Sequence, residues 1–357
     1  MSDSEPGRGA DGTASLDDEP THPDSEAPSS HPDSEPPSAP DALDLLLREV
    51  ARLPEPRRPP PTQRAETGEQ PDRPSRQGQV VSSRYRVEGL LGEGAMGEVW
   101  RAVDLRTAEP VALKFMKTGA KVAEQHRRFL REARAASAVV HRNVVRVHEI
   151  VEIDDEHPVL VMELLVGETL AEKLAREGKI PPHEVARIFL GVVAGVGAAH
   201  ALAIVHRDLK PANIFLTDVG RDEPLVKVLD FGLAKLTSLV GTIWNTATGT
   251  IVGTPPYMSP EQAFAEKDLD DRTDIWSLGV ILYECLSGEL PSRGREFGRV
   301  LRTLLTGRFR PLREVVPEVP EELAGLVQRQ LSFERKDRPT LVEMHAVLDP
   351  LAKSPRA

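Results

Sequence analysis

The sequence predicts an α+β fold of two lobes, in which a small sheet-rich lobe precedes a larger helical lobe. Three observations predict it: a disordered, proline-rich and acidic tail over residues 1–82, short β-like runs over residues 83–163, and mostly helical patterns over residues 167–351. Strands and helices that are segregated along the chain are typical of α+β proteins. We expect the functional residues to meet in a cleft between the two lobes.

The tail is identified by its composition. Residues 1–80 contain fifteen of the 31 prolines, and the first forty residues hold ten acidic side chains against one arginine. Such a segment cannot bury enough apolar surface to offset the conformational entropy that folding would cost. The tail also carries most of the net charge of −11, so the rest is nearly neutral and neither part is typical of a nucleic-acid-binding protein.

One stretch of the tail, residues 41–53, has an amphipathic pattern. Leu43, Leu46, Leu47 and Val50 are spaced as on one face of a helix, and Pro54 ends the pattern. Two interpretations stay open, because so short a helix is marginal in isolation. The stretch is either a helix that docks on a partner or on the folded part of the chain, or a transient helix in a solvated linker.

The folded part begins with strands. They are predicted at residues 85–91, 98–104, 111–117, 144–153 and 159–162, with a turn at 107–110 and a helix at 124–139. Residues 352–357 are expected to form a short C-terminal tail. Residues 188–205 are just long and apolar enough to suggest a membrane span, but their glycines and alanines and His200 favour a buried helix.

Two further features bear on the compartment. Cys285 is the single cysteine of the chain, which excludes an intramolecular disulfide framework. No basic stretch followed by an apolar core begins the chain, as a secretion signal would require. We therefore expect a cytoplasmic protein without a membrane span.

The first motif with chemical content is a glycine-rich loop. Glycines let a backbone approach phosphate oxygens closely. A dinucleotide-binding fold would need a helix directly after the glycines, whereas a strand is predicted here, and no P-loop pattern is present. The motif gives these nucleotide-binding candidates: Gly92, Glu93, Gly94, Ala95, Met96, Gly97, Glu98 and Val99.

The next two motifs add charged groups. Lys114 lies on an otherwise apolar strand and needs an anion, which Glu132 in the following helical stretch could supply. Much later come the runs His206-Arg-Asp208-Leu-Lys210-Pro-Ala-Asn213 and Asp230-Phe-Gly232. With these runs, residues 85–351 resemble the eukaryotic-like, or Hanks-type, protein kinases, and the glycine loop and the run from Tyr257 to Gln262 are most similar to the bacterial branch.

The resemblance implies a protein-kinase-like bilobal fold, a role in signal transduction, and a use for each group. Asp208 would accept the hydroxyl proton of the substrate, and Lys210 would neutralise the γ-phosphoryl group. Asn213 and Asp230 would bind Mg²⁺, with Mn²⁺ as a substitute, while Lys114, oriented by Glu132, would hold the phosphates of ATP. Adenine would contact Leu91, Val99, Ala112 and Phe215 and the backbone of Glu163 and Leu165, with Met162 limiting the depth of its site.

The same resemblance indicates serine or threonine as the phosphate acceptor. Lys210, two positions after Asp208, and Thr254 are typical of that branch. We expect autophosphorylation at Thr246 or Thr248, which would order the loop through Arg207; the alternative is a merely polar loop. Protein substrates and a homodimer for phosphorylation in trans would be the partners.

Structural roles are implied for three more residues. Glu261 and Arg338 resemble a buried ion pair of the family, and Asp274 resembles the residue that braces the catalytic loop. Ser259 departs from the pattern, because it replaces the usual alanine before Pro-Glu.

Two other functions stay open. A pseudokinase would bind nucleotide and partners without turnover, although it should lack at least one of Lys114, Asp208, Asn213 and Asp230, and all are present. Alternatively, the acidic tail would be the main functional part, a partner-binding arm.

Overall fold

The computed structural model describes residues 76–94, 97–116, 137–153, 158–217, 224–231, 255–264, 266, 268–292 and 297–354. The amphipathic stretch at residues 41–53 and most of the helix expected at residues 124–139 lie outside these ranges.

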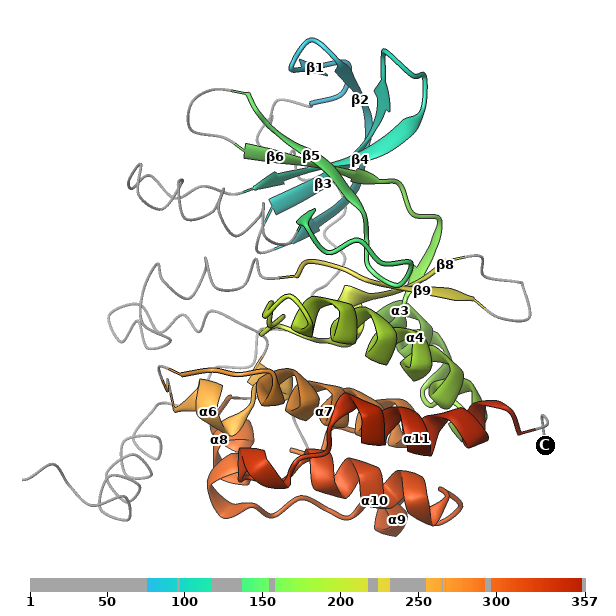
Figure 1. The fold of residues 1–357 in the computed structure, drawn as a ribbon, viewed down its shortest axis with the longest axis vertical. Coiled ribbons are helices and arrows are strands. Elements are labelled where there is room, and N and C mark those ends of the chain that lie inside the picture. Colours follow the sequence, from blue (N-terminus) through green and yellow to red (C-terminus); the bar gives the residue numbers. More distant parts are fainter. Residues whose placement is uncertain are drawn as a thin grey trace, which may run out of the picture. The chain divides into compact units, whose positions relative to one another are not determined.

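The described strands form two antiparallel sheets (Figure 1). The six-stranded sheet has the order β1-β2-β3-β4-β6-β5 and the three-stranded sheet the order β7-β8-β9. Their bounds are β1 Val80–Val81, β2 Tyr85–Gly94, β3 Gly97–Asp104, β4 Pro110–Met116, β5 Val147–Glu152, β6 Pro158–Glu163, β7 Gly167–Thr169, β8 Ile214–Thr217 and β9 Leu225–Val228.

The six-stranded sheet is built on apolar side chains of its central strands. On β2, Tyr85 and Val87 are buried while Arg86 between them is exposed, as the two-residue period of a strand with one buried face requires. On β4 and β6 nearly every residue is buried, and Leu113 and Val161 of these strands belong to one core cluster with β2. Burial on both faces makes β4 a rigid support for Lys114.

The described part of the sheet begins before residue 83, where the tail was expected to end. Val80 and Val81 pair with Arg86 and Tyr85 as strand β1, and Val81 is 1 % exposed within the core cluster. Composition placed these residues in the tail because two valines among polar neighbours have too little pattern to predict a strand. The pairing partner on β2 is what makes them one.

The described helices follow the three-stranded sheet or alternate with it. They are α3 Leu170–Glu177, α4 Pro182–His200, α6 Pro260–Ala263, α7 Arg272–Ser287, α8 Phe297–Thr306, α9 Leu312–Val315, α10 Glu321–Gln330 and α11 Leu341–Ala352, with the short 3₁₀ helices η1 Pro211–Asn213, η2 Pro255–Tyr257 and η3 Arg335–Asp337. The predicted α+β fold, with a sheet-rich first lobe and a helical second lobe, is confirmed.

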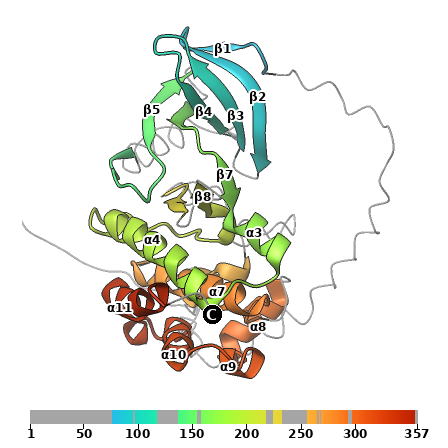
Figure 2. The ribbon, with the colours of Figure 1, turned by 90° about the vertical axis from the view of Figure 1, so that its right-hand side faces the viewer.

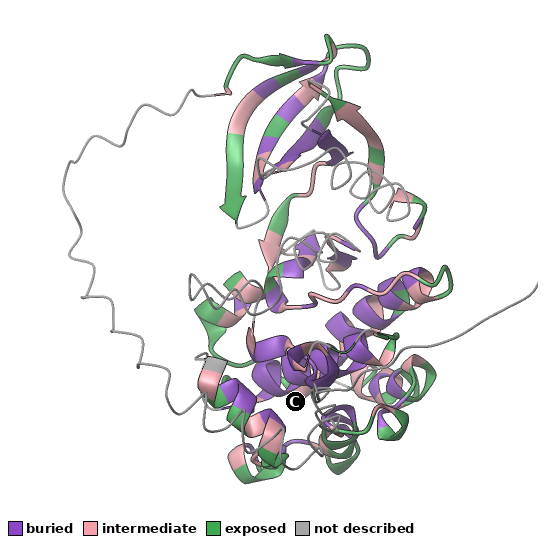
Figure 3. Ribbon diagram, turned by 90° about the vertical axis from the view of Figure 1, so that its left-hand side faces the viewer, coloured by how far each residue is buried: buried purple, intermediate pink, exposed green. Residues whose placement is uncertain are grey.

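Two helices form the centre of the second lobe. Every residue of α7 from Thr273 to Leu286 is buried, and Figure 3 shows this helix coloured as buried among its neighbours. Helix α4 packs against α11 and β9 (Figure 2). Among the described residues, no helix has the length and apolarity needed to cross a membrane.

The glycines of α4 have a packing reason. A Cβ atom on Gly195 would lie 2.6 Å from the carbonyl oxygen of Asn143, and one on Gly191 would lie 2.8 Å from Cβ of Val226. Small residues therefore let α4 approach the segment before β5 and strand β9. These are some of the same glycines that argued against a membrane span.

That segment before β5 also joins the two sheets. Val144 bridges to Val228 on β9 in parallel, with backbone bonds Val145 N–H to Val228 O of 3.0 Å and Val228 N–H to Asn143 O of 2.8 Å. The side-chain amide of Asn143 donates to the carbonyl of Val226 at 2.8 Å. Strand β9, which leads to Asp230, is thereby fixed to the chain that enters the six-stranded sheet.

Candidate active site

The glycine-rich loop is the hairpin between β2 and β3. Gly92 pairs with Val99, Glu93 with Glu98, and Gly94 with Gly97, while Leu91 is 53 % exposed. Ala95 and Met96, at the tip, lie outside the described residues. Gly97 has φ of +155°, and a Cβ atom there would lie 2.0 Å from the carbonyl oxygen of Phe115 on β4. Only glycine fits at the start of β3.

Lys114 on β4 forms an ion pair with Asp230. Its Nζ lies 2.6 Å from Oδ1 of Asp230, and the two side chains are 6 % and 22 % exposed. Burial alone would raise the pKa of Asp230, but the charge and hydrogen bond of Lys114, helped by His206 and Lys210, hold that pKa below its usual value. Asp230 is therefore an anion next to a lysine. Glu132, the partner expected for Lys114, lies outside the described residues.

The loop between α4 and η1 brings three more predicted residues together. Nζ of Lys210 lies 2.6 Å from Oδ2 of Asp208, and Nδ2 of Asn213 donates to the carbonyl oxygen of Asp208 at 2.8 Å. Asn213 in turn accepts a backbone bond of 2.9 Å from the N–H of Leu229, which precedes Asp230. A continuous path of contacts thus joins Asp208, Asn213 and Asp230, and through Asp230 it reaches Lys114.

The loop backbone is held by a buried carboxylate. Asp274 on α7 is 0 % exposed, and its oxygens accept from the N–H groups of His206 at 2.8 Å and Arg207 at 2.9 Å. Arg207 has φ of +68°, a left-handed conformation that costs a non-glycine residue about 1–2 kcal/mol. Such a conformation persists only where surrounding contacts determine it. Asp274 supplies two of them.

One buried nitrogen of this loop lacks a hydrogen-bond partner among the described residues. Nε of Arg207 is buried without a hydrogen-bond partner in the part of the chain that the structure describes. A buried donor of this kind is costly unless a ligand or a charged group satisfies it. Arg207 is thus a candidate anion-binding residue.

The side chains expected around adenine fall into two groups. Ala112 and Met162 are 5 % and 8 % exposed in one apolar cluster, and Val99 and Leu165 pack against that cluster. Phe215, on β8, is half-buried and pairs with Thr169 and Lys227. Leu91 does not belong to the cluster.

Glu163 was expected to bind adenine through its backbone. In the structure its backbone N–H and its carboxylate contact other residues of the chain. Its N–H donates to Arg146 O at 3.0 Å, and its carboxylate accepts from the N–H of Arg146 at 2.7 Å and from Nζ of Lys227 at 2.6 Å. Lys227 is 9 % exposed on β9. Sequence reasoning missed Lys227: a lysine within an apolar strand needs an anion, but the partner could not be read from the sequence because it lies 64 positions away.

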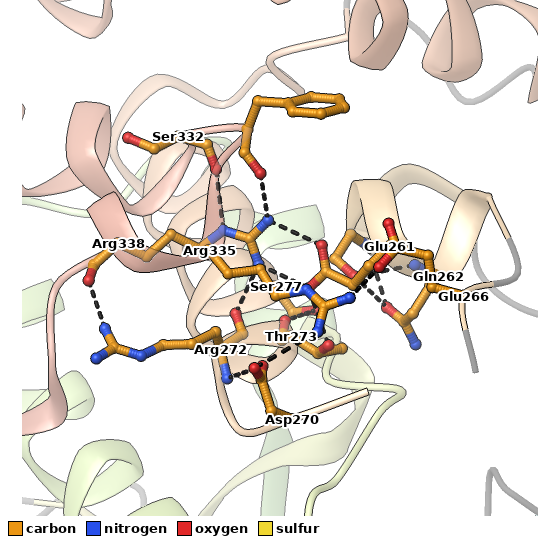
Figure 4. A network of polar contacts seen from close by, with 12 residues as sticks. Glu261, Gln262, Glu266, Asp270, Arg272, Thr273, Ser277, Ser332, Arg335 and Arg338 are labelled. Carbon is orange, nitrogen blue, oxygen red and sulfur yellow. Dashed lines mark hydrogen bonds and ion pairs between the residues drawn. The ribbon is translucent and has the colours of Figure 1, made fainter. Parts of the chain in front are cut away.

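Glu261 and Arg338 form a bidentate ion pair (Figure 4). The two oxygen–nitrogen distances are 2.7 and 2.8 Å, and the side chains are 2 % and 0 % exposed. Burial would raise the pKa of Glu261, but the hydrogen bond and charge of Arg338 lower it overall. Arg338 also donates to the carbonyls of Ser332, Phe333 and Arg272, so its charge is fully surrounded by acceptors.

Two residues that sequence reasoning missed support the loop, His200 through Asp274 and Gln262 by direct contact. His200, at the end of α4, places Nε2 2.8 Å from Oδ2 of Asp274, and Gln262 on α6 donates from Nε2 to the carbonyl oxygen of Arg207 at 2.6 Å. The spacing Ser259-Pro-Glu-Gln262 is a readable capping-box signal. Nothing in the sequence indicated that its glutamine also reaches a loop 55 positions earlier.

The remaining predicted residues, Thr246, Thr248 and Thr254, lie outside the described residues. The described ones fit a nucleotide with a divalent metal. Asp230 and Asn213 offer a carboxylate and an amide oxygen, hard ligands that Mg²⁺ accepts together with phosphate oxygens. Lys114 and Lys210 offer positive charge for those phosphates.

In this fold a buried lysine of the six-stranded sheet contacts the aspartate that follows the last strand of the three-stranded sheet. Such a fold is that of a protein kinase. The family model for the protein kinase domain matches residues 85–348, and the chain belongs to that family. The family implies ATP, a divalent metal and protein substrates.

Three curated relatives of the chain are bacterial kinases. The serine/threonine-protein kinase PknL of Mycobacterium tuberculosis is 36 % identical over 276 residues, which cover 77 % of this chain and 67 % of the relative. The serine/threonine-protein kinase pkn3 of Myxococcus xanthus is 37 % identical over 278 residues, 76 % of this chain and 50 % of the relative. PknA of Mycobacterium tuberculosis is 34 % identical over 271 residues, 74 % of this chain and 59 % of the relative. They confirm the prediction of a bacterial Hanks-type, ATP-dependent serine/threonine protein kinase over that of a pseudokinase.

Proposed function

We propose that this kinase transfers the γ-phosphoryl group of Mg²⁺-bound ATP to serine or threonine of protein substrates through Asp208, Lys210, Asn213, Lys114 and Asp230. The observation that carries the proposal is the path of contacts from Lys114 to Asp230 and from Asn213 to Asp208. These groups come from three separate parts of the sequence, and together they supply a proton acceptor, positive charge and metal-binding atoms. Catalysis by such a set consists mainly of positioning and electrostatics.

Each residue has a defined task in this proposal. Asp208 orients the substrate hydroxyl and receives its proton. Lys210, held 2.6 Å from Asp208, stabilises the negative charge of the phosphoryl group during transfer. Asp230 and Asn213 hold the metal, and Lys114 holds the phosphates. The metal, when bound, offsets the charge between the β- and γ-phosphates.

The adenine base fits the apolar cluster of Val99, Ala112, Met162 and Leu165. The N–H of Glu163 is already committed to Arg146, so the carbonyl oxygen of Glu163 is the group that would accept from the adenine amine. The glycine-rich hairpin would cover the phosphates, Leu91 would contact the adenine ring, and Phe215 would close the site from the β8 side. ATP is available in the cytoplasm, which is the compartment that we propose for the reaction.

Regulation by autophosphorylation is part of the proposal. Arg207 has a buried Nε without a partner among the described residues, as a site that receives a phosphate would. Thr246 and Thr248 are the threonines that we propose to be phosphorylated, in trans within a transient homodimer. Residues 41–53 are proposed to dock on a partner.

The test uses purified protein with Mg²⁺ and labelled ATP. Transfer to itself and to a generic protein substrate is expected, and Asp208→Asn should abolish both, since general base catalysis contributes about 10²–10⁴-fold. Mass-spectrometric mapping should find phosphate on Thr246 or Thr248 in the wild type and not in Asp208→Asn. Equal behaviour of the two proteins would refute the proposed roles, and full activity of the double variant Thr246→Ala, Thr248→Ala would refute the regulatory part.

A further inference from the structure

Helix α6 begins with a capping box. Ser259 accepts from the N–H of Gln262 through Oγ at 3.4 Å, while Oε1 of Gln262 accepts from the N–H of Ser259 at 3.1 Å and from its hydroxyl at 3.2 Å. Ser259 is 0 % exposed. This fixes the amide of Gln262, because one end of it is already bound to the cap residue. The serine that departs from the family pattern therefore has a contact that alanine could not make.

The other end of the same amide faces the catalytic loop. Nε2 of Gln262 donates to the carbonyl oxygen of Arg207 at 2.6 Å. That carbonyl belongs to the peptide bond whose N–H is on Asp208, and this N–H points to Nδ1 of His206 at 3.3 Å. The peptide that carries Asp208 is thus held from both sides.

The conformation of Arg207 makes this contact necessary. Its φ of +68° is unfavourable for a side chain with a Cβ atom, so the residue would relax if its neighbours allowed it. Asp274 holds the N–H of Arg207, but a bond at the N–H leaves rotation of the following peptide free. Gln262 holds the carbonyl, and the two contacts together fix both peptides that flank Arg207.

We infer that Gln262, oriented by Ser259, is a positioning residue for Asp208. This inference rests on the proposed role of Asp208 in phosphoryl transfer. A capping box alone needs only an oxygen at this side chain, so glutamate would serve it equally. The bond to Arg207 needs the N–H₂ group, which glutamate lacks.

The variant Gln262→Glu separates the two roles. It keeps the cap of α6 and replaces the donor to Arg207 by an acceptor that repels the carbonyl. We expect kcat to fall about 10- to 100-fold, the effect of a small misplacement of a reacting group. The KM for ATP and the Tm should remain as in the wild type. Hydrogen exchange at the amides of Arg207 and Asp208 should become faster, and exchange in α6 should not.

Two further variants complete the test. Ser259→Ala should lower kcat in the same direction by a smaller factor, because the amide remains but is no longer oriented. Glu343→Gln is the control. It replaces glutamate by glutamine in the capping box that Glu343 forms with Thr340 at the start of α11, and it should leave kcat unchanged.

Wild-type kcat in Gln262→Glu would overturn the inference. A fall in kcat that comes with a lower Tm and faster exchange throughout α6 would also overturn it, because the residue would then serve only its helix. If the wild type transfers no phosphate, the proposed function fails, whereas hydrogen exchange at Arg207 and Asp208 still decides whether Gln262 positions the loop.

Discussion

The ammonium group of Lys114 lies 2.6 Å from a carboxylate oxygen of Asp230, although 116 positions separate the two residues in the chain. Strand β4 is buried on both faces and sets the position of the lysine, while β9, bonded to the segment before β5, sets that of the aspartate. The contact between the two side chains therefore depends on how the two sheets are placed relative to each other.

Lys114→Met should lose at least about 100-fold in phosphate transfer and remain folded, because a preorganised charge is removed and an apolar chain of similar length replaces it. Without Lys114, burial should raise the pKa of Asp230. Because the protonated carboxyl is a poor metal ligand, binding of a divalent metal with nucleotide should be lost at a higher pH in the variant than in the wild type as the pH is lowered. Transfer assays and nucleotide titrations across pH measure both effects. Lys179→Met removes an exposed lysine paired with Glu318 and serves as the control; unchanged pH dependence in Lys114→Met would contradict the prediction.

The ion pair of Glu261 and Arg338 should be costly to break. Glu261→Gln or Arg338→Met leaves one buried charge without its counter-ion, which typically lowers the free energy of unfolding by about 3–5 kcal/mol. Denaturant unfolding measures this. Arg329→Met is the matched control, because its partner Glu343 and Arg329 itself are about half exposed, 48 % and 49 %, and such pairs contribute little. The prediction is wrong if the buried and exposed variants lose equal stability.

Acid should weaken the contact between Arg84 and Asp104. The hydrogen bond from Arg84 lowers the pKa of Asp104 to about 2, against about 3.9 for an unfolded aspartate. Because the folded pKa is the lower one, the stabilisation is fully present above about pH 4 and is lost as the pH falls toward 2. The difference in Tm between wild type and Asp104→Asn should be constant near neutral pH and shrink in that range.

The control for this pH dependence removes its cause. In an Arg84→Met background, the exchange Asp104→Asn should produce a difference in Tm that varies much less between pH 4 and 2. If that difference varies as strongly as it does with Arg84 present, the bond to Arg84 is not what sets the pKa.

Two glycines of the hairpin should respond differently to a methyl group. Gly97→Ala places a Cβ atom against the carbonyl of Phe115 and should cost about 1–3 kcal/mol, as overpacking does. Gly92→Ala meets nothing within 4 Å and should leave unfolding unchanged. Thermal unfolding of the two variants measures this difference in stability. Equal Tm values for Gly97→Ala and Gly92→Ala would exclude the clash.

Some parts of this protein could be predicted from local pattern. The strands β2, β4 and β6 follow from propensity and periodicity and appear near their expected bounds. The apolar stretch 188–205 was correctly predicted as helical over most of its length, but α4 begins at Pro182 and ends at His200. The chemistry-bearing residues were also recognisable, because a glycine-rich hairpin, a lysine on a buried strand and two aspartate motifs occur in one order. Residue type and spacing are properties that a sequence states directly.

Local pattern was enough to predict the class of fold and the family, and to propose Lys114, Asp208, Asn213 and Asp230 as site residues. Three other features became visible only in the folded chain: β1 belongs to the sheet, Lys227 pairs with Glu163, and Gln262 holds the carbonyl of Arg207. Each of these depends on a partner brought close by packing rather than by adjacency in the chain. Local preference can indicate that a group needs a partner, but the path of the backbone chooses which one.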